Sequence, residues 1–269
     1  MTVVPLAQAF AHRDSAHPRP VSDALDAGFT ALEVDVWLRG GQLLVGHDET
    51  ELRPDRTLAD TYLRPLAARA AAGRIRAARA APATADTGEA GGWPVTLVVD
   101  VKTAAAPTYR ALDGLLREHT PLLTRWRYGR CTPGPLTVLV SGERAVRALT
   151  AAPDRLAALD GRPGDLLPGA GHRGGAALRP VVSADWEKTV GWDGTGPLPR
   201  ARRILLAAMV RRAHARQRRL RFWATPDTPG PARSVVWDLL LNSGVDLINT
   251  DDLTGLAGHL RARAARALL

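Results

Sequence analysis

Cysteine is almost absent from this chain of 269 residues, because Cys131 is the only one. A single cysteine cannot form an intramolecular disulfide, and it cannot build a cysteine-based zinc site. Cys131 stands in a run rich in proline and glycine, Cys131-Thr132-Pro133-Gly134-Pro135, with no histidine beside it. We therefore expect a loop at this position and no catalytic thiol.

Long apolar runs are missing as well. No stretch approaches the roughly 20 consecutive apolar residues that a membrane-spanning helix needs. The first residues lack the basic segment and long apolar stretch of a secretory signal peptide. Hydrophobic residues make up 45% of the chain and charged residues 23%, which is typical of a soluble globular domain. We expect a cytoplasmic protein.

Lysine is scarce, since Lys102 and Lys188 are the only two, and arginine supplies most of a net charge of +9. The densest basic run, 211–221, is typical of the solvated end of a helix that leads into a strand. It lacks the interleaved aromatic residues of surfaces that bind single-stranded nucleic acid. We therefore expect no nucleic-acid partner, although a basic surface favours anionic substrates such as phosphodiesters.

Short apolar runs alternate with alanine- and leucine-rich helical stretches along the whole chain. Eight strands are expected, at 8–12, 31–38, 95–102, 136–141, 156–160, 180–184, 220–225 and 246–250. Helices are expected at 22–27, 58–73, 108–119, 143–151, 200–217, 232–242 and 253–268, while 82–92 and 161–175 have the composition of loops. This alternation predicts an α/β protein, a (β/α)₈ TIM-type barrel formed as a single domain over 1–269. Gly40-Gly41 predicts a small β-hairpin after the second strand.

Two acidic residues lie on the second predicted strand, in Leu32-Glu33-Val34-Asp35-Val36. Side chains two residues apart in a strand point to the same face, so Glu33 and Asp35 point together into the barrel. Buried carboxylates need compensation, and their hard oxygens suit one divalent cation, Mg²⁺ or Ca²⁺. The alternative is a structural pair at the barrel mouth in which an arginine holds one partner.

The third predicted strand is a nearly continuous apolar run that Asp100 and Lys102 interrupt on one face. Asp100 can complete a three-carboxylate metal site with Glu33 and Asp35. Lys102 would lie beside it, where a phosphate oxygen binds, and this position favours a compact ammonium over a guanidinium. The alternative is that Lys102 only neutralises Asp100.

Two histidines follow strands at the end where barrel enzymes carry their chemistry. His12 ends the first strand, and His47 follows the predicted hairpin. Imidazole titrates near neutrality, so the two can act as base and acid. Gly171-His172-Arg173-Gly174 also resembles a catalytic turn, but it lies in a mid-chain loop, and we interpret it as coincidental.

The last two strands bring further candidates for substrate contact. Arg221 and Trp223 share a face of the seventh strand, and Trp223 can form an apolar or cation–π wall for a headgroup or fill the core. Asn249 ends the eighth strand, in Asn249-Thr250-Asp251-Asp252, and we expect it to contact the substrate.

Together these motifs resemble the superfamily of glycerophosphodiester phosphodiesterases, phosphatidylinositol-specific phospholipases C and sphingomyelinase D-type enzymes. The resemblance is carried, in order, by Ala11-His12-Arg13-Asp14, Glu33-Val34-Asp35-Val36, 40–49, Asp100-Val101-Lys102, Phe222-Trp223 and Asn249-Thr250-Asp251. It implies Glu33, Asp35 and Asp100 as ligands of Mg²⁺ or Ca²⁺ and His12 and His47 as the catalytic pair. It also implies Arg13 and Lys102 near the phosphate and Trp223 along the substrate.

Two departures concern the substrate. Asp14 replaces the usual glycine of the first motif. The third ligand of glycerophosphodiesterases is commonly glutamate, whereas Asp100 resembles the sphingomyelinase D-like branch. The expected reaction is cleavage of a glycerophosphodiester or a phospholipid headgroup ester, with a small-molecule or lipid partner and contact with a membrane surface. The alternatives are a lyase that releases a cyclic phosphate, a non-catalytic barrel that binds headgroups, and a basic nucleic-acid-binding module.

Overall fold

The apolar runs of the sequence form a closed barrel of eight parallel strands. The structure is a computed structural model that describes residues 3–77, 92–167 and 175–267. The barrel strands are β1 (Leu6–Ala11), β2 (Phe29–Arg39), β4 (Val95–Val101), β7 (Leu136–Gly142), β9 (Ala157–Gly161), β10 (Val181–Asp185), β11 (Arg219–Trp223) and β12 (Leu247–Thr250). They are hydrogen-bonded in chain order, and pairing of β1 with both β12 and β2 closes the ring. The prediction of a TIM-type barrel is confirmed.

The hairpin expected after the second strand is also present. β3 (Gln42–Val45) runs antiparallel to the end of β2, with Arg39 opposite Gln42 across the Gly40-Gly41 turn. A small separate sheet was not expected. Its strands β5 (Arg125–Arg127), β6 (Arg130–Thr132) and β8 (Asp154–Arg155) pair in the order β6-β5-β8. Cys131 lies on β6 and is exposed, so the expectation of a loop there was wrong.

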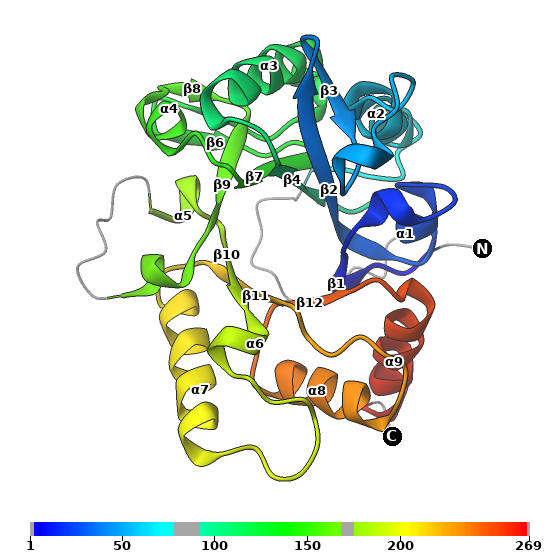
Figure 1. Ribbon diagram of the computed structural model, residues 1–269, viewed down its shortest axis with the longest axis vertical. Coiled ribbons are helices and arrows are strands. Elements are labelled where there is room, and N and C mark those ends of the chain that lie inside the picture. The colour runs from blue at the N-terminus through cyan, green and yellow to red at the C-terminus, as the bar shows by residue number, and fades with distance from the viewer. Residues whose placement is uncertain (1–2, 78–91, 168–174, 268–269) are drawn as a thin grey trace.

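Helices surround the barrel (Figure 1). They are α1 (Ser22–Asp26), α2 (Arg64–Ala71), α3 (Ala105–Glu118), α4 (Val146–Ala151), α5 (Gly175–Leu178), α6 (Trp186–Thr189), α7 (Arg200–His214), α8 (Pro231–Asn242) and α9 (Leu253–Arg266). Shorter 3-10 turns lie at Asp14–Ala16, Glu49–Glu51, Thr120–Leu122 and Pro163–Leu166, and a π-helical turn at Ala59–Leu63 precedes α2. The catalytic-looking turn 171–174 and most of the loop expected at 82–92 lie outside the described residues. In the described part of the chain, no helix combines the length and hydropathy needed to span a bilayer.

The core has two layers, one between strands and helices and one inside the barrel. Seven strands each send one apolar side chain to the inner layer: Phe10, Ala31, Val98, Leu139, Ala158, Val181 and Leu247. The strand β11 is the exception. Its Arg221 is only 3% exposed, and its guanidinium carbon lies 3.8 Å from the centre of the Phe10 ring. Arg218 is buried as well, so the expectation of a solvated basic run across 211–221 was wrong at its strand end.

Candidate active site

Three carboxylates converge at the carboxyl end of β2 and β4. Glu33 and Asp35 alternate with Val34 along β2, and Asp35 is the register partner of Asp100 on the neighbouring β4. One carboxylate oxygen from each of Glu33, Asp35 and Asp100 lies within 4.8 Å of the others. The structure thus brings together the three residues that the sequence proposes as metal ligands, at the end of the barrel where chemistry occurs in this fold.

The carboxylate oxygens of this cluster that lack hydrogen-bond partners suit a cation. Glu33 and Asp35 are 7% and 3% exposed, and burial raises the pKa of Asp35 above its ordinary value. Each residue keeps one buried oxygen without a hydrogen-bond partner: Glu33 Oε2, Asp35 Oδ2 and Asp100 Oδ1. A buried unpartnered carboxylate oxygen is costly. Three of them aimed at one region form the all-oxygen donor set that Mg²⁺ and Ca²⁺ prefer, so the residues fit such an ion.

Lys102 forms ion pairs with two of these carboxylates, through the oxygens that are not left without a partner. Its Nζ lies 2.9 Å from Asp35 Oδ1 and 2.8 Å from Asp100 Oδ2. Burial opposes its charge, but the hydrogen bonds to Asp100 and Asp35 outweigh burial and raise the pKa of Lys102, which therefore remains an ammonium. The ion pairs show that Lys102 neutralises both aspartates. Because it uses one oxygen of each, the other oxygen of each remains available for a cation.

Gly142 shapes the space around Asp100. It ends β7 with a φ of +64°, a conformation that disfavours any residue with a side chain. A Cβ atom at this position would collide with Asp100 Oδ1 and with the backbone nitrogen and oxygen of Val101. The glycine therefore lets the β7 backbone pass directly against a proposed metal ligand.

His12 follows β1 and lies between two acidic residues. Its Nδ1 is 2.7 Å from Asp251 Oδ1, and its Nε2 is 3.3 Å from Glu33 Oε2. Burial alone would lower the pKa of His12, but the hydrogen bond that its ring donates to Asp251 and the charges of Glu33 and Asp251 raise that pKa above its ordinary value. Asp227 in turn accepts hydrogen bonds from Thr250 Oγ1 and the Asp251 backbone N–H, both at 2.6 Å. This chain of contacts fixes the orientation of the imidazole.

His47 lies at the rim of the same end. The preceding Gly46 donates its N–H to the carbonyl of Asp35 at 3.3 Å, which holds this segment beside the end of β2. Trp37 Nε1 donates to the Gly46 carbonyl at 2.9 Å, and the His47 N–H donates to Glu51 Oε2 at 2.8 Å. The backbone is therefore fixed on three sides, while the His47 side chain remains 39% exposed.

Two of the residues expected to contact substrate lie at the rim. Arg13 has a left-handed backbone with a φ of 43°, its buried Nε has no hydrogen-bond partner, and its guanidinium is 4.0 Å from Glu51. Trp223 ends β11 and is 37% exposed, with Lys188 Nζ 5.8 Å from its ring centre.

Asn249 is placed differently, because its side-chain oxygen is already committed. It accepts hydrogen bonds from Arg221 Nε at 3.1 Å and from a terminal nitrogen of Arg221 at 2.7 Å. Both residues are buried, and that guanidinium also lies 3.7 Å from Glu33 Oε2. In this structure Asn249 positions Arg221, and Arg221 places a fixed positive charge beneath the carboxylate cluster.

Sequence reasoning did not single out the polar network on the next strands. Asp160 is 1% exposed and accepts hydrogen bonds from Ser141 Oγ at 3.0 Å and Ser183 Oγ at 2.7 Å. Burial raises its pKa, while the nearby guanidiniums of Arg221 and Arg162 favour its charged form. The signal was present in the sequence, since Asp160 and Ser183 each end or interrupt an apolar strand as Asp100 does.

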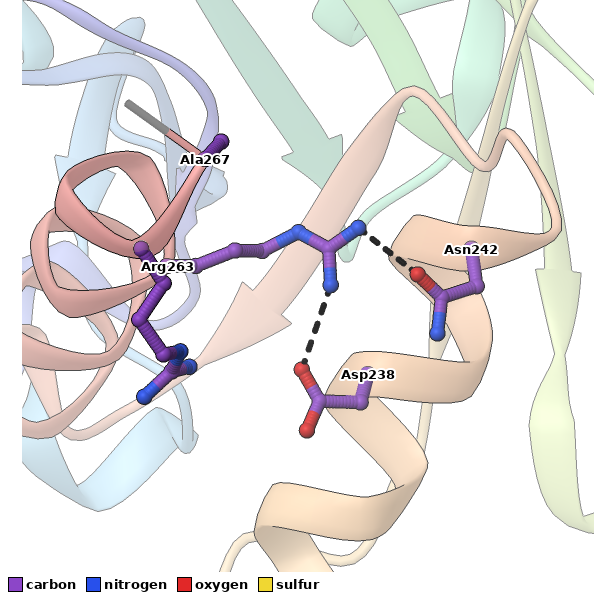
Figure 2. Close-up of a pocket in the computed structure, with 5 residues that line it drawn as sticks. Asp238, Asn242, Arg263 and Ala267 are labelled. Carbon is purple, nitrogen blue, oxygen red and sulfur yellow. Dashed lines mark hydrogen bonds and ion pairs between the residues drawn. The ribbon is translucent and has the colours of Figure 1, made fainter. Parts of the chain in front are cut away.

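A surface hollow elsewhere in the molecule does not belong to this site. It is lined by Asp238, Asn242, Arg263, Arg266 and Ala267, near the carboxyl ends of α8 and α9 (Figure 2). Helices of a βα barrel run opposite to its strands, so these helix ends lie away from the catalytic end. Arg263 is already bonded there to Asn242 Oδ1 at 2.7 Å and lies 3.5 Å from Asp238 Oδ1.

The barrel and the site at its mouth define a protein of the glycerophosphodiester phosphodiesterase and phospholipase C-like superfamily. The family model of the AIM6-like phosphodiesterase domain matches residues 1–155, more than half of the chain. The chain therefore belongs to the AIM6-like phosphodiesterase family. The matched part includes His12 and His47, the three carboxylates of the cluster and Lys102.

Two curated relatives are fungal. The "Altered inheritance of mitochondria protein 6 homolog" of Arthroderma benhamiae is 28% identical over 247 residues, covering 88% of this chain and 76% of the relative. The "Altered inheritance of mitochondria protein 6" of Eremothecium gossypii is 26% identical over 283 residues, covering 94% of this chain and 69% of the relative. Both alignments extend past the part matched by the family model.

Two solved structures share the fold. A glycerophosphodiester phosphodiesterase of Parabacteroides distasonis superposes with a TM-score of 0.56 at 13% identity, covering 96% of this chain and 98% of the other. A glycerophosphoryl diester phosphodiesterase of the same organism gives a TM-score of 0.57 at 12% identity, with 97% and 88% coverage. At these identities the likeness establishes the barrel and leaves the substrate open.

Proposed function

We propose that this protein is a metal-dependent phosphodiesterase that cleaves a glycerophosphodiester or a phospholipid headgroup ester by histidine acid–base catalysis. Glu33, Asp35 and Asp100 would hold one divalent cation, Mg²⁺ or Ca²⁺. The observation that carries the proposal is the set of three buried carboxylate oxygens that accept no hydrogen bond, one of which, Glu33 Oε2, lies 3.3 Å from His12 Nε2. Membership of a phosphodiesterase family supports the same reaction class.

Positively charged groups at the site would stabilise the negative charge of the phosphodiester. A bound cation would polarise the phosphoryl group and offset its charge. The Lys102 ammonium and the Arg13 guanidinium would add positive charge at the phosphoryl oxygens. Trp223, exposed at the rim, would pack against the headgroup.

The tautomer of His12 follows from its contacts. A carboxylate 2.7 Å from Nδ1 holds the proton on that nitrogen, which leaves Nε2 as the basic atom of the neutral ring. Nε2 faces Glu33 and the proposed cation site, so it is the atom that would take a proton from the attacking hydroxyl. His47 would protonate the leaving oxygen from the rim. Attack by water gives hydrolysis, and attack by a hydroxyl of the substrate gives a cyclic phosphate.

The test is a substrate panel followed by phosphorus NMR. The purified chain is treated with EDTA, returned to Mg²⁺ or Ca²⁺, and given glycerophosphodiesters, lysophospholipids and sphingomyelin. We expect turnover of at least one substrate class with metal and none in EDTA. A phosphomonoester product assigns hydrolysis, and a cyclic phosphate assigns the lyase reaction. If the protein binds headgroups but turns over no substrate with any divalent metal, the proposed catalysis is wrong and the barrel is a headgroup-binding protein.

A further inference from the structure

Exposed apolar side chains are concentrated at the catalytic end of the barrel. Among the described residues, large apolar side chains are exposed at seven positions. Val4 and Tyr128 precede β1 and β7 and so lie at the opposite end. Of the other five, Trp223 ends β11 and Leu167 follows the short helical turn after β9. Ile204, Leu205 and Val235 lie in the first two turns of α7 and α8, the helices that follow β10 and β11.

The beginning of α7 combines this apolar exposure with positive charge. All six residues from Arg200 to Leu205 are exposed, and Ile204 is 57% exposed. We call its arginines and apolar residues the α7 patch: Arg200, Arg202, Arg203, Ile204 and Leu205. In the part of the chain that the structure describes, none of the three arginines forms an ion pair, and the first turn of α7 contains no acidic residue.

Contacts connect the α7 patch to the proposed site. A terminal nitrogen of Arg202 donates to the carbonyl of Thr189 at 3.0 Å, which ties the start of α7 to the end of α6. The preceding Lys188 lies 5.8 Å from the ring centre of Trp223 at the rim. Figure 1 shows α6 at the ends of β10 and β11, with α7 on their flank. The start of α7 therefore lies beside the α6 segment, which contacts Trp223 at the rim of the barrel mouth.

We propose that the α7 patch docks the barrel mouth on an anionic lipid bilayer. The inference rests on the proposed function and narrows it to a membrane-resident lipid phosphodiester. Unpaired arginines complement anionic headgroups, and each basic residue near such a surface strengthens binding about fivefold. Ile204 and Leu205 lie where an aliphatic side chain would enter the headgroup boundary. A lipid drawn from that surface would reach the mouth without leaving the bilayer completely.

The test is co-sedimentation of the full chain with vesicles of phosphatidylcholine, with or without phosphatidylglycerol, in EDTA so that no turnover occurs. The variants are R200E/R203E and I204S/L205S. The matched control is R211E/R212E, which changes charge equally on the exposed far end of the same helix. The two arginine pairs are roughly 12–18 Å apart along α7, beyond the Debye length of about 8 Å at physiological salt.

We expect wild-type binding only to vesicles with phosphatidylglycerol. R200E/R203E should weaken it about 10²-fold or more, since four units of charge change, and I204S/L205S should weaken it even at low salt. The control should bind within about threefold of wild type, because its charges are screened from the docking surface. Equal losses in both arginine variants, or no binding to anionic vesicles, would overturn the proposal.

Failure of the proposed function would look different. In that case vesicles would be bound, while no phosphodiester, soluble or in vesicles, would be turned over with either metal. If docking alone is wrong, a soluble phosphodiester is turned over and vesicles are not bound. Binding of an acidic protein or of a second copy by the patch, without vesicle binding, also overturns the membrane assignment.

Discussion

Replacing Gly142 by alanine should damage both the fold and the proposed metal site. Gly142 has a φ of +64°, and a residue with a Cβ in that conformation costs about 1–2 kcal/mol. The new Cβ would also lie closer than 3.0 Å to Asp100 Oδ1 and to the Val101 backbone. A side-chain rotation cannot relieve the contact with the backbone, so overpacking adds about 1–3 kcal/mol. The free energy of unfolding should fall by about 2–5 kcal/mol.

A second glycine separates the two contributions. Gly196 has a φ of +61°, and a Cβ there would meet nothing within 4 Å. Gly196→Ala should therefore show only the conformational cost of about 1–2 kcal/mol. The excess loss in Gly142→Ala, about 1–3 kcal/mol, measures the collision beside Asp100.

The assays are urea denaturation and calorimetric titration of the cation. Gly142→Ala should weaken cation binding by about 10–100-fold, as expected when the support of a ligand is displaced. Gly196→Ala should bind the ion as wild type does. Equal stability losses in the two variants, or unchanged cation affinity in Gly142→Ala, would refute this account of how β7 passes Asp100.

Three further predictions concern individual side chains. His12→Ala or His47→Ala should each lower kcat by about 10²–10⁴-fold in steady-state assays, and near-full activity of either variant removes that histidine from the mechanism. Lys102→Gln should lower kcat by roughly 10²–10³-fold at saturating metal, because the ammonium would no longer stabilise charge on the phosphoryl group. If turnover is unchanged and only the free energy of unfolding in EDTA falls, Lys102 serves only to neutralise the two aspartates. Asn249→Ala should destabilise the fold by about 1–3 kcal/mol because it leaves the buried Arg221 donors unpaired, whereas Asn249→Asp keeps the acceptor, and equal stability of the two in urea would contradict the pairing.

The barrel could be predicted because its strands are short apolar runs with few alternatives. The expected strands at 95–102 and 136–141 became Val95–Val101 and Leu136–Gly142. The small β5-β6-β8 sheet was missed because its strands are only two or three residues long and arginine-rich, so no period-2 apolar pattern marks them. Trp126, on β5 of that sheet, packs against the apolar side chains inside the barrel. This is a tertiary contact that the local sequence does not show.

The carboxylate cluster could be predicted from spacing alone, since alternation put Glu33 and Asp35 on one face and parallel pairing put Asp100 beside them. The partners that orient His12 could not. Asp251, directly after β12, contacts the imidazole, and Asp227, in the segment after β11, holds the Asp251 backbone. Both lie more than 200 residues from His12 along the chain. Likewise, Asn249 was expected to meet the substrate, and only the fold shows that its oxygen is held by Arg221.

The most direct measurement is calorimetric titration of the EDTA-treated, desalted chain with Mg²⁺ and with Ca²⁺. The matched control is Asp238→Asn, which removes a carboxylate bonded to His259 at the far end of the molecule. We expect one ion per wild-type chain, unchanged binding in the control, and affinity at least about 10-fold lower in Asp35→Asn and Asp100→Asn. Wild-type protein that binds neither ion, or Asp100→Asn that binds as tightly as wild type, would contradict the proposed metal site.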